Sequence, residues 1–192
     1  PTVHVIGEIA GALGFPSSNL YARYEIVYDS THWHVMQGNE TGYTHVDETS
    51  GSGNAVWNHP VDVHFGTDSF EGWPKMLVEV WSVDECDRSE LAGYGMCFIP
   101  SSPSSYDLDI VTWRPQGTLA DRLSAALLGA PPHLSQVGTA ASGADRFELR
   151  TETAGTVLWH VEVLTSGFVE RNARLGARRS VTCLSQPVAC SW

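Results

Sequence analysis

Apolar and polar residues alternate with a period of two along most of the chain, in short runs rich in Val, Ile, Tyr and Trp. Runs such as "VHVIGEIAGALGF", "NLYARYEIVYD" and "PKMLVEVWSVD" are separated by Gly, Pro, Asn and Ser. Successive side chains of a strand point to opposite faces, so this pattern predicts strands with one buried face. About eight such strands at short spacing predict an all-β, antiparallel β-sandwich. The sequence "ETAG" near the end predicts a hairpin turn between two of these strands.

One segment, "TLADRLSAALLG", breaks the alternation. Its residues Leu119, Leu123, Ala126 and Leu127 recur at helical spacing and would share one face. Thr118 is a suitable N-cap, and a glycine followed by a proline would end the helix. The pattern therefore predicts one amphipathic helix inserted between the last strands, where we expect it to pack over an open end or edge of the sandwich.

After residue 165 no period is visible, which predicts a domain over residues 1–168 and a flexible basic tail over 169–192. The chain has a net charge of −11, and residues 166–192 contain four arginines and one glutamate, so they carry +3 and the remaining body −14. Binding to nucleic acid needs a basic face, so this body excludes nucleic acid as an expected partner. It also disfavours adsorption to anionic lipid, except through the tail.

No run of 18 or more apolar residues is present, and the first residues lack the pattern of a secretory signal. The four cysteines form no CxxC pair and are too sparse for a disulfide framework. We therefore expect an intracellular protein with reduced thiols.

Histidines cluster in "WNHPVDVHF" and "THWHVM". In a strand, His59 would share the apolar face, whereas Asp62 and His64 would lie on the opposite one. His32 and His34 form a second pair on one face. A catalytic zinc takes about three protein ligands, so neither pair is sufficient alone and a metalloenzyme is the weakest hypothesis. We expect His59 to be a partly buried structural residue, and Asp62 and His64 to contact solvent or a partner.

The motifs of known catalytic sites are absent. The chain has no GxSxG nucleophile elbow, no phosphate-binding GxxxxGK[ST] loop and no dinucleotide fingerprint. The sequence thus favours a protein that is not an enzyme and has no cofactor.

The stretch "VWSVDECDRSELAGYG" resembles the aspartate-rich, calcium-binding loop of C2 domains. In that pattern the carboxylate positions fall on Ser82, Asp84 and Glu90, and an earlier loop places Asn19 where an aspartate would stand. Calcium requires about six to eight oxygen ligands. If the fold is C2-like, we expect these four positions to form a degenerate site that does not bind metal.

The chain is similar to the B9-domain family in a series of ordered motifs: "HVIGEIAGALGF", "VWNHPVDVHF", "GWPKMLVEVWS", "LAGYGMCFIPSSP", "TWRPQG" and "SGADRFELRTETAGTVLWHVEV". The resemblance covers about residues 3 to 165 and implies a C2-like β-sandwich at the basal body and transition zone of the cilium. It implies a scaffold that assembles with B9 domain-containing protein 1 and the Meckel syndrome type 1 protein, together with a tectonic-type membrane complex. Such an assembly would support ciliogenesis and gate the ciliary membrane.

An alternative function is a calcium-independent, peripheral membrane-binding module of the C2 type. Seven tryptophans exceed what one small core easily buries, and tryptophan and arginine are enriched at interfaces. The same residues also serve as local packing, with Arg114 over Trp113 or beside a carboxylate, so both interpretations stay open. The candidate contacts with a protein partner are Trp73, Trp113, Arg114, Ser101, Ser102, Asp62 and His64.

Overall fold

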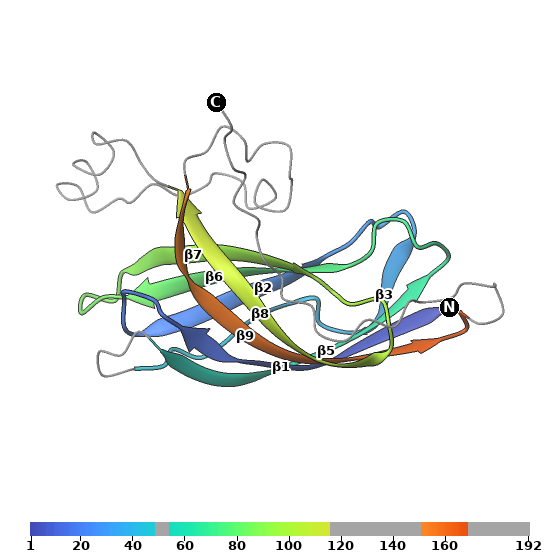
Figure 1. The fold of residues 1–192 in the computed structure, drawn as a ribbon, viewed down its shortest axis with the longest axis horizontal. Helices are drawn as coiled ribbons and strands as arrows, with labels where there is room; N and C mark the ends of the chain where they lie inside the picture. Colours follow the sequence, from blue (N-terminus) through green and yellow to red (C-terminus); the bar gives the residue numbers. More distant parts are fainter. Residues whose placement is uncertain (49–53, 116–150, 169–192) are drawn as a thin grey trace, which may run out of the picture.

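The computed structural model describes residues 1–48, 54–115 and 151–168 (Figure 1). These residues form strands and connecting loops, which confirms the all-β prediction. The strands are β1 (Thr2–Leu13), β2 (Leu20–Val27), β3 (Trp33–Gly38), β4 (Thr41–Tyr43), β5 (Ala55–Thr67), β6 (Lys75–Val83), β7 (Ser89–Phe98), β8 (Ser104–Pro115) and β9 (Thr151–Ser166). The expected amphipathic helix over 118–129 and the expected tail over 169–192 lie outside the described residues. No helix in the described part of the chain is long and apolar enough to cross a membrane.

The strands form one continuous antiparallel sheet in the order β3-β5-β1-β9-β8-β7-β6-β2-β4. The expectation was a sandwich of about eight strands, whereas hydrogen bonds here run through nine strands in a single sheet. The sheet curls, as Figure 1 shows, so that its two halves face each other. Asn39 and Glu40 alone connect the two edge strands β3 and β4, and the Ile26 N–H donates to the Glu40 carbonyl (2.7 Å). This short link holds the two edges of the curled sheet together.

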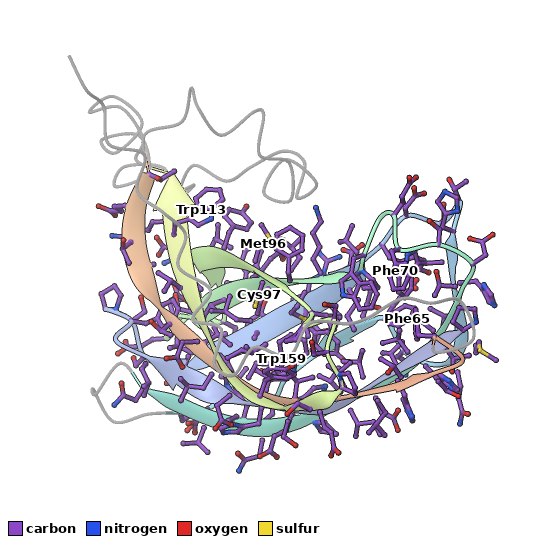
Figure 2. The ribbon with its side chains drawn as sticks, turned by 45° about the vertical axis from the view of Figure 1, so that its right-hand side comes forward. Phe65, Phe70, Met96, Cys97, Trp113 and Trp159 are labelled. Atoms are coloured by element: carbon purple, nitrogen blue, oxygen red, sulfur yellow. The ribbon has the colours of Figure 1, made fainter. Side chains whose placement is uncertain are left out.

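The main core lies inside the curl and is built from the apolar side of each strand. The prediction for β5 is confirmed, because Trp57, Val61 and Phe65 are all buried there. The indole N–H of Trp57 donates to the Leu20 carbonyl (3.1 Å), so this buried polar group is satisfied. Figure 2 shows Phe65 and Trp159 within the enclosed side chains. On β5, the alternation of the sequence thus determines which side of the strand faces inward.

The predicted hairpin turn at "ETAG" is wrong, because residues 152–155 lie within the uninterrupted strand β9. Gly155 serves close packing here: a Cβ at this position would lie 2.5 Å from the ring of Phe15. Its carbonyl also accepts a hydrogen bond from the Thr112 hydroxyl (2.8 Å). A glycine inside a strand can mark such a close approach as well as a turn, and local sequence does not distinguish the two.

The expectation of reduced thiols is also wrong in part. Cys86 is a free and exposed cysteine. Cys97, on the inner side of β7, is disulfide-bonded.

Candidate functional site

The four positions of the C2-type calcium site meet at one end of the sheet. Ser82 pairs with both Leu20 and Glu90 across neighbouring strands, and the Val83 N–H donates to the Asn19 carbonyl (3.0 Å). Three of the four side chains, however, do not present an aspartate carboxylate there.

The side chains of Asn19 and Ser82 have structural roles in the loops. Asn19 has a φ of 54°, a left-handed conformation that asparagine adopts more readily than most residues, and its amide donates to the Val83 carbonyl (3.4 Å). Ser82 is 8% exposed and its hydroxyl donates to the Glu90 carbonyl (3.3 Å). These contacts stabilise the ends of β2, β6 and β7.

Asp84 is already paired with a cation of the protein itself. Its carboxylate accepts hydrogen bonds from the backbone N–H groups of Cys86 (2.8 Å) and Arg88 (2.9 Å), and from the Arg88 guanidinium (2.7 Å). The backbone and side-chain hydrogen bonds from Arg88 hold the pKa of Asp84 below its usual range. The Arg88 guanidinium therefore neutralises the one aspartate that sequence reasoning retained as a ligand.

Asp62 and His64 lie on the outer side of β5, as strand parity predicts, and both contact His4 on β1. His4 Nε2 lies 2.7 Å from the Asp62 carboxylate. The rings of His4 and His64 stack with their centroids 4.8 Å apart. No local pattern connects His4 with this pair, because the residues meet only through the pairing of β1 with β5.

His32 and His34, the second histidine pair of the sequence, have different neighbours. His32 lies beside Asp68 (3.0 Å) and Glu71 (3.8 Å), and His34 lies against Gly66 on the neighbouring strand. In residues 1–48, 54–115 and 151–168, no group of three or more His, Cys, Asp or Glu side chains has the arrangement of a metal site.

His59 is partly buried, as expected, and its ring packs against Tyr24 (5.6 Å between centroids). Burial, and then the nearby His45, lower the pKa of His59.

Aromatic side chains gather at the opposite end of the sheet from the Asp84 loop. Trp73 donates its indole N–H to the Ile99 carbonyl (2.8 Å) and stacks on Phe70 (6.2 Å between centroids). Phe70 is 45% exposed and Phe98 is 59% exposed. Trp73 and Phe98, with Val27, Tyr28, Asp29, Gly72 and Lys75, line a pocket of about 470 Å³. We call Phe70, Trp73 and Phe98 the aromatic end.

Trp113 and Arg114, at the end of β8, have partners within the fold. Trp113 is 5% exposed and packs on Tyr94, with 5.5 Å between ring centroids. Arg114 forms an ion pair with Glu152 of β9, in agreement with the expectation that it could pair with a carboxylate. A side chain as buried as Trp113 is poorly placed to contact another protein.

Ser101 and Ser102 lie in the loop between β7 and β8. Ser101 is exposed, and the Ser102 carbonyl accepts a hydrogen bond from the Tyr106 hydroxyl (2.9 Å). The structure thus places the seven candidate contacts in three regions: the aromatic end with its neighbouring loop, the outer side of β5, and the end of β8.

Comparison with known proteins supports the resemblance. The B9-C2 family model, described as ciliary basal body-associated B9 protein, matches residues 3–164. B9 domain-containing protein 2 of Mus musculus is 42% identical over 166 residues, which covers 86% of this chain and 94% of that protein. The Homo sapiens protein is 42% identical over 170 residues, covering 88% and 94%.

Two more distant similarities were also found. Tectonic-like complex member MKS1 of Homo sapiens is 29% identical over 199 residues, covering 92% of this chain and 35% of that protein. A C2 domain of plant extended synaptotagmin 1 is 11% identical with a TM-score of 0.43, covering 86% of this chain and 96% of that structure. Because the family model and the relatives above 30% identity both span most of the sequence, the chain belongs to the B9 family of ciliary basal body-associated proteins.

Proposed function

We propose that this protein is a non-enzymatic scaffold subunit of a complex at the ciliary transition zone, where it assembles with other B9-domain proteins. The observation that supports this most directly is the family match over residues 3–164. The complex would support ciliogenesis and control which membrane proteins enter the cilium. Its expected partners are B9 domain-containing protein 1 and the Meckel syndrome type 1 protein, with a tectonic-type membrane complex beside them.

The aromatic end is the surface that best fits a protein partner. Exposed aromatic side chains beside a preformed pocket are typical of interface anchors, because they bury a large apolar area when a partner docks. Phe98 is 59% exposed, and Trp73, which lines the same pocket, is fixed by its hydrogen bond to the Ile99 carbonyl. The outer side of β5, with Asp62 and His64, is a second and more polar candidate.

Co-expression with the two other B9-type proteins tests the scaffold function. A stoichiometric complex that elutes as one species in gel filtration is the expected result. Separate elution of all three proteins at micromolar concentration would contradict the scaffold function itself.

Surface variants then test the position of the interface. Phe98→Glu places a charge at the aromatic end, and Val56→Glu does the same at an equally exposed residue of β5 (62%). We expect Phe98→Glu to weaken the complex by about tenfold or more, as loss of an anchor residue does, and Val56→Glu to leave it intact. A complex that tolerates Phe98→Glu but not Asp62→Ala would move the interface to the outer side of β5.

Calcium-independent membrane binding is the second candidate function, and the pairing of Asp84 with Arg88 favours it over calcium-dependent binding. Sedimentation with phosphatidylserine-containing vesicles, in calcium or in EGTA, separates the two modes. We expect the bound fraction to be the same in both buffers. Binding that appears only with calcium would show that the Asp84 loop holds the ion despite Arg88.

A further inference from the structure

The sheet carries a second apolar cluster on its outer side. Leu77, Leu91, Tyr94 and Trp113 form this cluster, and Val27, Trp81 and Met96 pack against it. On β6 these residues alternate with Met76 and Val78, which face the main core. We call Leu77, Trp81, Leu91, Tyr94, Met96 and Trp113 the outer apolar face. Figure 2 shows Trp113 and Met96 on one side of the strands and Trp159 inside the curl.

The burial of this face is unusual for the outside of a sheet. Leu77 is 3% exposed, Tyr94 2% and Trp113 5%. An antiparallel sheet with a single core normally presents polar side chains on its other face. The outer side of β1 and β5, with His4, Asp62 and His64, follows that rule, whereas the outer side of β6 and β7 is mostly apolar. The exception on β6 is Glu79, which is 3% exposed, lies 3.7 Å from the Arg23 guanidinium and accepts a hydrogen bond from the Trp81 indole N–H (3.2 Å).

The described strands do not form a layer over this face. The main contacts of β6 are with its sheet neighbours β2 and β7, and those of β8 are with β7 and β9. Side-by-side neighbours cover the flanks of a side chain but leave its outer end open. The described strands alone therefore do not account for the low exposure of Leu77, Tyr94 and Trp113.

The chain itself supplies a segment of suitable pattern and position. Residues 116–150 leave β8 at Pro115 and rejoin β9 at Thr151, and these two residues pair with each other. The segment therefore starts and ends at one place, close to Trp113, and none of its length is needed to bridge a distance. It begins with the amphipathic stripe Leu119, Leu123 and Leu127.

The length of a helix over residues 118–129 also matches the width of the outer apolar face. A helix over the twelve residues 118–129 would be about 18 Å long. Neighbouring strands are about 4.8 Å apart, so β8 and β6 are separated by about 10 Å. A helix that begins beside Trp113 can consequently cross β7 and place its apolar side over both Tyr94 and Leu77.

We propose that the outer apolar face is the docking surface of residues 118–129 of the same chain, with Leu119, Leu123 and Leu127 packed on Leu77, Tyr94 and Trp113. The face is then a second core, and Trp113 is a packing residue within it. This docking needs no partner protein, so it holds whether or not the proposed scaffold function is correct. It leaves the aromatic end as the apolar surface available to partners.

Photo-crosslinking of the full chain tests the occupant directly. A benzophenone amino acid replaces Met96, a half-buried residue of the outer apolar face, and the irradiated protein is mapped by mass spectrometry. We expect a link within one chain to a peptide from residues 118–129. A covalent dimer, a link to any other part of the chain, or no link at all would overturn the proposal.

A matched pair of variants tests the packing. Leu123 lies on the proposed contact side, whereas Leu128 lies about 180° from Leu119 around a helix of 3.6 residues per turn. We expect Leu123→Asp to lower the melting temperature by about 4 °C or more and to increase acrylamide quenching of tryptophan fluorescence. Leu128→Asp should change both readings little. Equal effects of the two variants would contradict the proposed face of the helix. Failure of Leu123→Asp alone to fold would agree with the proposal.

Discussion

Two tryptophans of the main core differ in one polar contact, and this difference leads to a quantitative prediction. Trp57 is 3% exposed and Trp159 is completely buried. The Trp57 indole N–H donates to the Leu20 carbonyl, whereas the buried Trp159 N–H finds no acceptor among the described residues. Replacing each with phenylalanine removes the same atoms from the same core. Any difference between the two variants therefore reports on the N–H group.

The expected free energies of unfolding follow from the contacts. Loss of ring volume from a packed core costs each variant about 1–2 kcal/mol. Trp57→Phe also loses a hydrogen bond with a net contribution of about 1 kcal/mol, so it should be destabilised by about 2–3 kcal/mol. Trp159→Phe removes a buried, unsatisfied donor that costs about 1–3 kcal/mol, so it should be close to neutral. The middle of these ranges gives a gap of about 3 kcal/mol between the variants.

Equilibrium unfolding in urea, followed by far-UV circular dichroism, measures this gap without depending on tryptophan emission. With a slope of about 2 kcal/mol per molar urea, the two midpoints should differ by about 1.5 M, with Trp159→Phe the more stable. Coincident midpoints, or a lower midpoint for Trp159→Phe, would refute the reasoning from the unsatisfied donor.

Three further predictions concern ionisation and backbone packing. The hydrogen bond to Glu40 raises the pKa of Tyr28 to about 12, so the folded state retains the phenol proton to a higher pH than the unfolded state does. The stabilisation of about 1 kcal/mol that Tyr28→Phe removes should therefore be constant below pH 10 and disappear between pH 10 and 12, which urea midpoints at each pH will show. Burial lowers the pKa of His59, so wild-type stability should fall as the pH drops below 6.5. His59→Gln should make the decrease in urea midpoint between about pH 7 and pH 5 smaller; an unchanged decrease would assign it to other groups. Gly7→Ala would place a Cβ 2.0 Å from a backbone carbonyl oxygen of β9, so we expect a loss of about 3 kcal/mol or more, seen as a lower melting temperature or insoluble protein. Gly14→Ala meets only open space at a φ of 74° and should cost about 1–2 kcal/mol; equal losses would disprove the clash.

The family resemblance and the loop chemistry show different limits of sequence reasoning. The motif around Asp84 lies at the end of the sheet where β2, β6 and β7 meet. The pairing of Asp84 with Arg88 depends on the turn of the β6–β7 loop, and the spacing of charges alone did not reveal it. Phe70 and Phe98 were not among the candidate contacts, because their exposure depends on the ends of the strands rather than on their residue type.

The sequence by itself determined the all-β class and, for a strand such as β5, which face is buried. This was possible because a strand repeats every two residues, so the local order of apolar and polar positions already separates Val61 and Phe65 from Asp62 and His64.

Only the tertiary structure decided what lies opposite each face. It joined His4 to Asp62 across two strands, carried β9 straight through the predicted turn at Gly155, and gave β6 and β7 a mostly apolar outer side. Each of these results depends on residues far apart in the chain, and a pattern with a range of a few residues holds no information about them.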